Sequence, residues 1–201
     1  MEKDAYKTIL EASPDSLYRE KGSKFIGYAF PVTDEDQVKQ HITQLKKVHY
    51  NARHWCYAWQ LGTSYENYRV NDDGEPSNSA GMPILGQLQS FQLTNTLIVV
   101  VRYFGGTKLG VGGLMQAYKA AARMSIESSK IVEKTIDAYF ILMFDYPEMN
   151  VVMRIIKDEK IHLLHQIMNL RCEFKLAVRK KEAERIFNLF QNTYKVSIKQ
   201  A

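Results

Sequence analysis

The chain has 201 residues, of which 45% are hydrophobic and 24% are charged, and it contains 11 Gly and 5 Pro. This composition excludes the disordered, collagen-like and repeat classes, and it leaves room for one large domain or two compact ones. The net charge of +5 is mildly basic, which suits a nucleic-acid or ribosomal partner and equally an ordinary solvated surface.

The sequence carries no sign of export or membrane insertion. The N-terminal residues are charged from the start and lack the apolar region of a signal peptide. The longest strongly apolar run, Leu97 to Val101, is far shorter than the roughly 20 residues of a membrane span. Cys56 and Cys172 form no CxxC pair and no disulfide framework. We therefore expect a cytoplasmic protein.

Strands and helices alternate over the first two thirds of the chain. Strands are expected at 6–10, 15–20 and 23–32, and a helix capped by Thr33 follows them. Alternation from 54 to 61 predicts a strand whose three aromatic residues face the core, although they could also form a base-stacking platform. Next come a buried strand from Thr96 to Tyr103, a glycine-dense turn and a helix at about 113–128.

The last third of the chain has a different order of strands and helices. Strand patterns at 138–145, 161–168, 171–178 and 195–199 alternate with two helical patterns in the order βαββαβ. This order is that of the ferredoxin-like arrangement. We therefore expect two domains, 1–134 and 135–201, in an α+β protein.

The most informative segment runs from Val99 to Tyr118, where a buried strand passes through five glycines into a helix. Glycines let another surface approach the backbone N–H groups, and the helix start is positive, so the turn suits phosphate or another anion. Arg102 and Lys108 add positive charge. The pattern matches neither GxxxxGK[ST] nor GxGxxG, and the glycines could also serve only a tight crossover. The glycines are Gly105, Gly106, Gly110, Gly112 and Gly113.

A second polar segment holds three carboxylates, Asp72, Asp73 and Glu75, within four positions. Such a group could bind Mg²⁺, but Asp-Gly and Glu-Pro are also turn signals, and carboxylates in turns often cap backbone amides. Ser77 and Ser79 could cap a helix that begins near Pro83.

The third segment, ARHWCYAW, begins at Ala52. Arg53 and His54 could contact a phosphate, and His54 could carry a proton, although a histidine on a strand is often structural. Cys56 shares the strand face of His54, but no third group is evident to orient a Cys–His pair.

These segments together resemble the YigZ/IMPACT family. ARHWCYAW, DDGEPSNSAGMPIL and RYFGGTKLGVGGLMQAY occur in the family's order and separation, and SKFIGYAF fits its opening. The resemblance covers about residues 15–130 and is weaker beyond them. Two positions depart from the family pattern: Ser79 stands where Thr is common, and Gln116 stands where Arg is common. An anion site that relied on position 116 would be weakened in this chain.

The resemblance implies an N-terminal domain of the ribosomal-protein-like, left-handed βαβ superfamily. It also implies a ferredoxin-like C-terminal domain similar to a domain of elongation factor G. Eukaryotic relatives regulate translation under stress, and bacterial relatives are described as associated with nucleic acid or translation. No catalytic residue, metal or cofactor can be carried over.

Three hypotheses remain open. The first is a regulatory protein that binds RNA or a ribosome-associated surface through an anion-binding set and an acidic motif. The second is a Mg²⁺-dependent enzyme for a phosphorylated small molecule, and the third is a module that binds only proteins. The expected anion-binding set is Arg53, His54, Arg102, Gly105, Gly106, Lys108, Gly110, Gly112 and Gly113, and the acidic motif is Asp72, Asp73 and Glu75.

Overall fold

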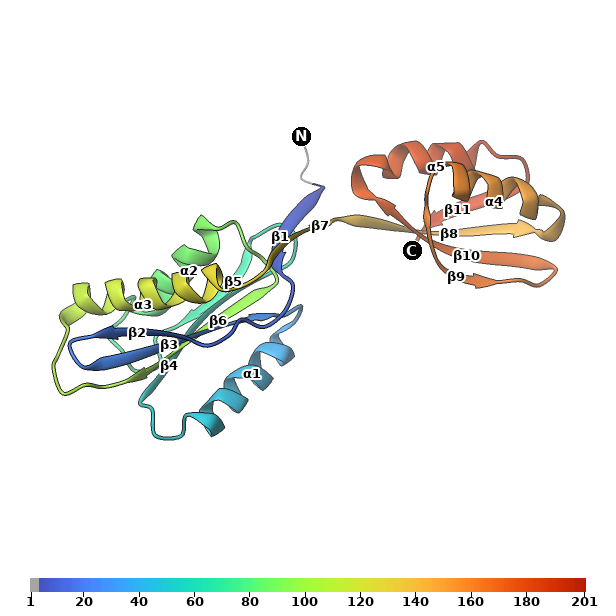
Figure 1. The fold of residues 1–201 in the computed structure, drawn as a ribbon. Helices are drawn as coiled ribbons and strands as arrows, with labels where there is room; N and C mark the ends of the chain where they lie inside the picture. The colour runs from blue at the N-terminus through green and yellow to red at the C-terminus, as the bar shows by residue number, and fades with distance from the viewer. Residues whose placement is uncertain (1–3) are drawn as a thin grey trace. The chain divides into compact units, whose positions relative to one another are not determined.

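The computed structural model describes residues 4–201, which divide into two compact units. The larger unit spans residues 6–134, and residues 135–201 belong to the smaller unit together with Asp4 and Ala5. Each unit combines an antiparallel sheet with helices, as expected for an α+β protein (Figure 1). No helix within residues 4–201 is long and apolar enough to cross a membrane.

The larger unit is built on a five-stranded sheet with the order β2-β3-β6-β4-β5. Because β3 and β4 each pair antiparallel with β6, they run parallel to each other with β6 between them. The helix α1 connects them, so the unit contains a split βαβ motif. The strands are β2 (Ser16–Glu20), β3 (Ser23–Pro31), β4 (His54–Leu61), β5 (Asn67–Asn71) and β6 (Thr96–Tyr103).

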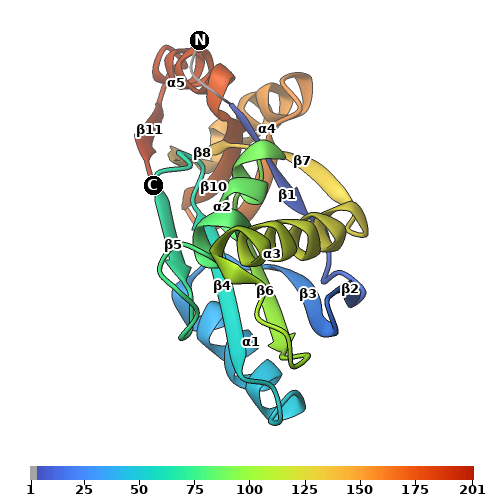
Figure 2. The ribbon, with the colours of Figure 1, turned by 90° about the vertical axis from the view of Figure 1, so that its left-hand side faces the viewer.

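Helices cover both faces of this sheet (Figure 1). On one face, α1 (Glu35–Val48) packs against Leu97, Val99 and Val101 of β6. Trp59 belongs to the same cluster and is buried, as expected for a core aromatic residue. On the other face, α2 (Gly81–Ser90) and α3 (Gly110–Glu127) lie side by side over Ile98 and Val100 (Figure 2).

Two short strands, β1 (Ala5–Ile9) and β7 (Ile131–Thr135), form a separate two-stranded sheet. Neither β5 nor β7 was expected from the sequence. Most of their residues are exposed or half-buried, so they lack the apolar alternation that marks a core strand.

The smaller unit has the ferredoxin-like order that the sequence predicts. Its sheet has the order β11-β8-β10-β9 with antiparallel pairing throughout. The helices α4 and α5 supply the inward-facing Val152, Ile186 and Phe190 of a single core. The elements are β8 (Asp137–Asp145), α4 (Met149–Asp158), β9 (His162–Ile167), β10 (Arg171–Arg179), α5 (Ala183–Gln191) and β11 (Val196–Gln200), with short 3-10 turns at Tyr146–Glu148 and Lys180–Glu182.

Two expected helix caps are wrong in detail. The cap of α1 is Asp34 and not Thr33: the Asp34 carboxylate accepts a hydrogen bond from the Gln37 N–H at 2.8 Å. Neither Ser77 nor Ser79 caps α2. The Asp72 carboxylate does so from a distance, because it accepts the N–H groups of Ala80 and Gly81.

Candidate functional site: a basic pocket beside a buried carboxylate

Three segments that are far apart in the sequence meet at one end of the larger unit's sheet. The β4–β6 register places His54 opposite Arg102, and the loop after β5 brings in Glu75. The turn between β6 and α3 adds Phe104 and Lys108 to the same hollow. The result is a pocket of about 450 Å³, here called the basic pocket, whose polar lining is Arg53, His54, Glu75, Arg102 and Lys108.

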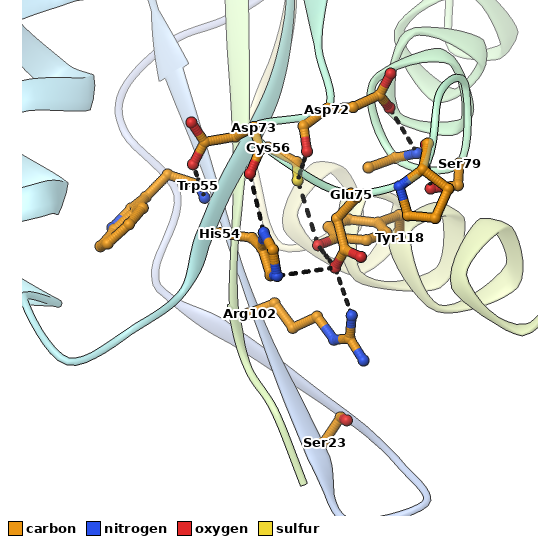
Figure 3. Close-up of polar contacts among 12 residues, drawn as sticks. Ser23, His54, Trp55, Cys56, Asp72, Asp73, Glu75, Ser79, Arg102 and Tyr118 are labelled. Carbon is orange, nitrogen blue, oxygen red and sulfur yellow. Dashed lines mark hydrogen bonds and ion pairs between the residues drawn. The ribbon is translucent and has the colours of Figure 1, made fainter. Parts of the chain in front are cut away.

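Glu75 is the centre of this site (Figure 3). Its Oε1 accepts hydrogen bonds from Arg102 Nη1 at 2.5 Å and from the Tyr118 hydroxyl at 2.8 Å. His54 Nε2 lies 3.9 Å from the same oxygen. The side chains of Arg102 and Glu75 are only 6% and 4% exposed, so this is a buried ion pair. A buried carboxylate needs such partners, because an unpaired charge in the interior is strongly unfavourable.

His54 is held in one orientation by the loop that follows β5. Its Nδ1 lies 2.9 Å from the carbonyl oxygen of Asp73, which can only accept a hydrogen bond, so Nδ1 carries a proton (Figure 3). Nε2 is therefore the nitrogen that faces Glu75 and the pocket. The histidine is thus both structural, through Nδ1, and available to a ligand, through Nε2.

Cys56 lies behind the pocket and is completely buried. Its Sγ is 3.0 Å from the Asp72 carbonyl oxygen and 3.3 Å from the Tyr118 hydroxyl, and no hydrogen bond joins it to His54. Burial raises the pKa of the Cys56 thiol far above its usual value, and burial likewise raises the pKa of Tyr118. Both groups therefore stay protonated at neutral pH, so Cys56 is not an activated nucleophile.

We expect Cys56 to resist alkylation in the folded protein. In a Cys172→Ser variant, the reaction of Cys56 with iodoacetamide at mildly alkaline pH should be about a thousandfold slower than in the unfolded chain. The reason is that the buried thiol is neutral and can react only when the protein transiently unfolds around it. Mass spectrometry of timed samples measures the rate, and the same sample in denaturant is the control. Rapid stoichiometric labelling of the native protein would show that the thiol is accessible.

The three carboxylates of the acidic motif do not converge. Asp72 accepts N–H groups from Asn78, Ala80 and Gly81, and Asp73 accepts the N–H of Trp55 at 2.8 Å. Among residues 4–201, no group of three or more His, Cys, Asp or Glu side chains is placed to hold a metal ion. The hypothesised Mg²⁺ site is therefore not formed by Asp72, Asp73 and Glu75. Asp72 and Asp73 instead fix the loop that places Glu75 in the pocket.

The basic pocket has cationic groups with no protein partner. Within residues 4–201, the side chains of Arg53 and Lys108 have no ion pair or hydrogen bond, and Nη1 is the only side-chain nitrogen of Arg102 that has one. The first turn of α3 also lines the pocket. Its cap residue, Leu109, supplies no side-chain acceptor, and the turn contains no acidic residue, so backbone N–H groups remain for a ligand.

The glycines of the expected anion-binding turn have separate positions. Gly110 lines the basic pocket, whereas Gly105 packs against the β2–β3 turn and its N–H donates to Ser23. Gly106 and Gly113 are not among the residues that line the pocket. Gly112 lines a different hollow, a groove of about 650 Å³ between α2 and α3.

Gln116 also lines the α2–α3 groove and not the basic pocket. The expected weakening of an anion site by this residue therefore does not apply to the basic pocket. The positive charge of the basic pocket comes from Arg53, Arg102 and Lys108 and does not depend on position 116.

Two contributors to the site were not recognised in the sequence. Tyr118 lies on the buried stripe of α3, and a tyrosine there signals a partner for its hydroxyl, which is Glu75. Phe104 is 42% exposed, and its ring centroid lies 5.6 Å from the guanidinium carbon of Arg102. An aromatic residue directly before a pair of glycines was the available signal.

Comparisons with known proteins agree with the fold and the motifs. Residues 21–126 match the model of the Impact N-terminal domain. The IMPACT family member YvyE of Bacillus subtilis is 34% identical over 178 residues, which cover 89% of this chain and 82% of that protein. The IMPACT family member YigZ of Escherichia coli is 31% identical over 144 residues, which cover 70% and 71% of the two chains.

A crystal structure of a hypothetical protein shares the fold. It is 22% identical and matches with a TM-score of 0.73 over 98% of this chain and 97% of that chain. With the motifs, the matched domain model and relatives that align over most of their length, this chain belongs to the IMPACT family.

Proposed function

We propose that this protein binds RNA, or an RNA-bearing ribosomal surface, through the basic pocket. The observation that carries the proposal is the grouping of Arg53, Arg102 and Lys108 around the uncapped start of α3, with Glu75 as the only carboxylate in the lining. Arg102 is paired with Glu75, and its guanidinium carbon lies 5.4 Å from the Phe25 ring centroid and 5.6 Å from the Phe104 ring centroid. A phosphate group could thus meet positioned donors at little cost in side-chain entropy.

The setting we propose is the regulation of translation in the cytoplasm. It rests on the family resemblance, which implies a role in the regulation of translation. The smaller unit would supply a second contact, in keeping with its ferredoxin-like order. The protein then acts as a binding protein, and no residue of the basic pocket is assigned a catalytic role.

Binding of a fluorescent single-stranded RNA should weaken steeply as salt rises, because each phosphate contact releases counterions. The double variant Arg53→Ala/Lys108→Ala should bind more weakly. Loss of two phosphate contacts should also make the slope of log affinity against log salt shallower by about 1.4, at about 0.7 per contact on a single strand. Fluorescence anisotropy over a salt series measures both quantities.

Lys119→Ala is the matched control, because Lys119 is an exposed cation on α3 that lines the α2–α3 groove instead. It should leave the affinity and the slope close to those of the unchanged protein. If RNA affinity is independent of salt, or if Lys119→Ala reduces it as much as the double variant does, the basic pocket is not the RNA site. Sedimentation with ribosomal particles at low salt tests the translational setting.

A further inference from the structure

The lining of the basic pocket has a polar part and an apolar part. Its polar part holds three cations, one histidine and one carboxylate, as described above. The rest is apolar, and Phe104 and Val111 are 42% and 52% exposed. A surface that contacts only the phosphate groups of a nucleic acid does not require apolar side chains such as these. The apolar residues are Pro76, Phe104, Leu109, Val111 and Leu114.

The size of the pocket points to a small group. Its volume of about 450 Å³ falls in the range of small-molecule sites, about 300–1,000 Å³. Arg53, Arg102 and Lys108 all line this one pocket, so the pocket suits a compact anion that is attached to an apolar ring system.

Two charged side chains in the pocket, Glu75 and Arg102, have atoms that make no hydrogen bond within the described chain, and of these atoms Arg102 Nε is the one that is fully buried. All three contacts of Glu75 are made by Oε1, and Oε2 has no partner among residues 4–201. Arg102 is 5% exposed, and its Nε and Nη2 likewise have none in that part of the chain. Buried polar groups are rarely left unpaired, so the unpaired Nε of Arg102 favours a ligand that offers a hydrogen-bond acceptor to this guanidinium.

We propose that the basic pocket holds one nucleotide with a terminal phosphate monoester, either a free nucleoside monophosphate or the phosphorylated end of an RNA. The phosphate meets Arg53, Lys108 and the first N–H groups of α3. The base lies against Phe104, where stacking tolerates any base. A monoester carries close to two negative charges at neutral pH, more than an internal phosphodiester, and so gains more from these cations. This inference rests on the proposed function and names the part of the RNA that is recognised.

The test compares one short single-stranded RNA in three forms: with a phosphate at one end, with a phosphate at the other end, and with hydroxyls at both ends. Fluorescence anisotropy measures their affinities, and adenosine monophosphate, adenosine and inorganic phosphate are added as competitors. We expect one phosphorylated form to bind at least about tenfold more tightly than the hydroxyl form. Adenosine monophosphate should compete better than adenosine or phosphate alone.

Variants of Phe104 separate stacking on the base from attraction of the phosphate. Phe104→Leu keeps apolar bulk and should weaken adenosine monophosphate roughly tenfold, whereas Phe104→Trp should retain its affinity. Neither variant should change the affinity for inorganic phosphate. Circular dichroism confirms that each variant is folded.

The outcomes distinguish this inference from the proposed function. Equal binding of all three RNA forms, with no competition by adenosine monophosphate, would overturn the inference and leave RNA binding standing. Binding of adenosine monophosphate, measured directly by titration calorimetry, without any binding of RNA would support the nucleotide site and overturn the RNA proposal. Preference for a phosphorylated RNA end, with competition by the free nucleotide, would support both. Binding of neither RNA nor nucleotide would overturn both.

Discussion

Replacing Gly105 with alanine is expected to destabilise the larger unit by about 3 kcal/mol. A Cβ atom at this position would lie 1.9 Å from the Gly22 carbonyl carbon and 2.2 Å from the Ser23 nitrogen. Both are backbone atoms of the β2–β3 turn, so no side chain can rotate away and the strand ends must separate. The Gly105 N–H also donates to the Ser23 hydroxyl at 3.1 Å, and that contact would be strained as well.

Urea unfolding followed by tryptophan fluorescence measures this effect, because both tryptophans, Trp55 and Trp59, lie in the larger unit. Gly112→Ala is the matched control from the same glycine-rich segment. Gly112 lies in α3, and nothing stands within 4 Å of the position of an added Cβ. Because alanine favours helix, this variant should gain about 0.5–1 kcal/mol. Equal effects of the two substitutions would contradict the close contact between Gly105 and Gly22.

Replacing Glu75 with alanine is expected to destabilise the protein by about 3–5 kcal/mol. The change leaves the Arg102 guanidinium buried without its counter-charge and removes the acceptor of the Tyr118 hydroxyl. Most of the cost comes from the charge left behind and not from the worth of the pair itself. A double variant, Glu75→Leu/Arg102→Met, should therefore be more stable than Glu75→Ala, because it removes both charges.

The same urea titration measures these variants. Arg123→Ala is the control, because Arg123 pairs with Glu127 on α3 and the two side chains are 61% and 47% exposed. Loss of this surface pair should change stability by no more than about 1 kcal/mol. If Glu75→Ala costs as little as Arg123→Ala, then water reaches the Glu75–Arg102 pair in solution and the pair is not buried.

The order of strands and helices was largely predictable, because it depends on local patterns. The β-branched run of β6 and the aromatic alternation of β4 each mark a strand within a few residues. The edge strand β5, with the sequence NYRVN, has no such pattern, because it gains its place by pairing with β4 and not by burial. The start of α3 was expected at Gly113 and lies at Gly110, because glycines carry no helical signal of their own.

The caps show the same limit at the level of single residues. Thr33 and Asp34 are adjacent and both suit a cap, and the backbone turn decides in favour of Asp34. The cap of α2 comes from Asp72, eight residues before Ala80, in a loop that doubles back on itself. Local sequence rules cannot find a cap supplied from such a distance.

The sequence by itself determined the family, the α+β class and the residue types of the candidate site, because short motifs and periodic patterns carry that information. Only the tertiary structure decided which of those residues act together. The β4–β6 register sets His54 beside Arg102, and the Asp72–Asp73 turn directs Glu75 between them. Sheet register and loop path depend on contacts between distant segments. The basic pocket therefore exists only once β4, β6 and α3 have packed together.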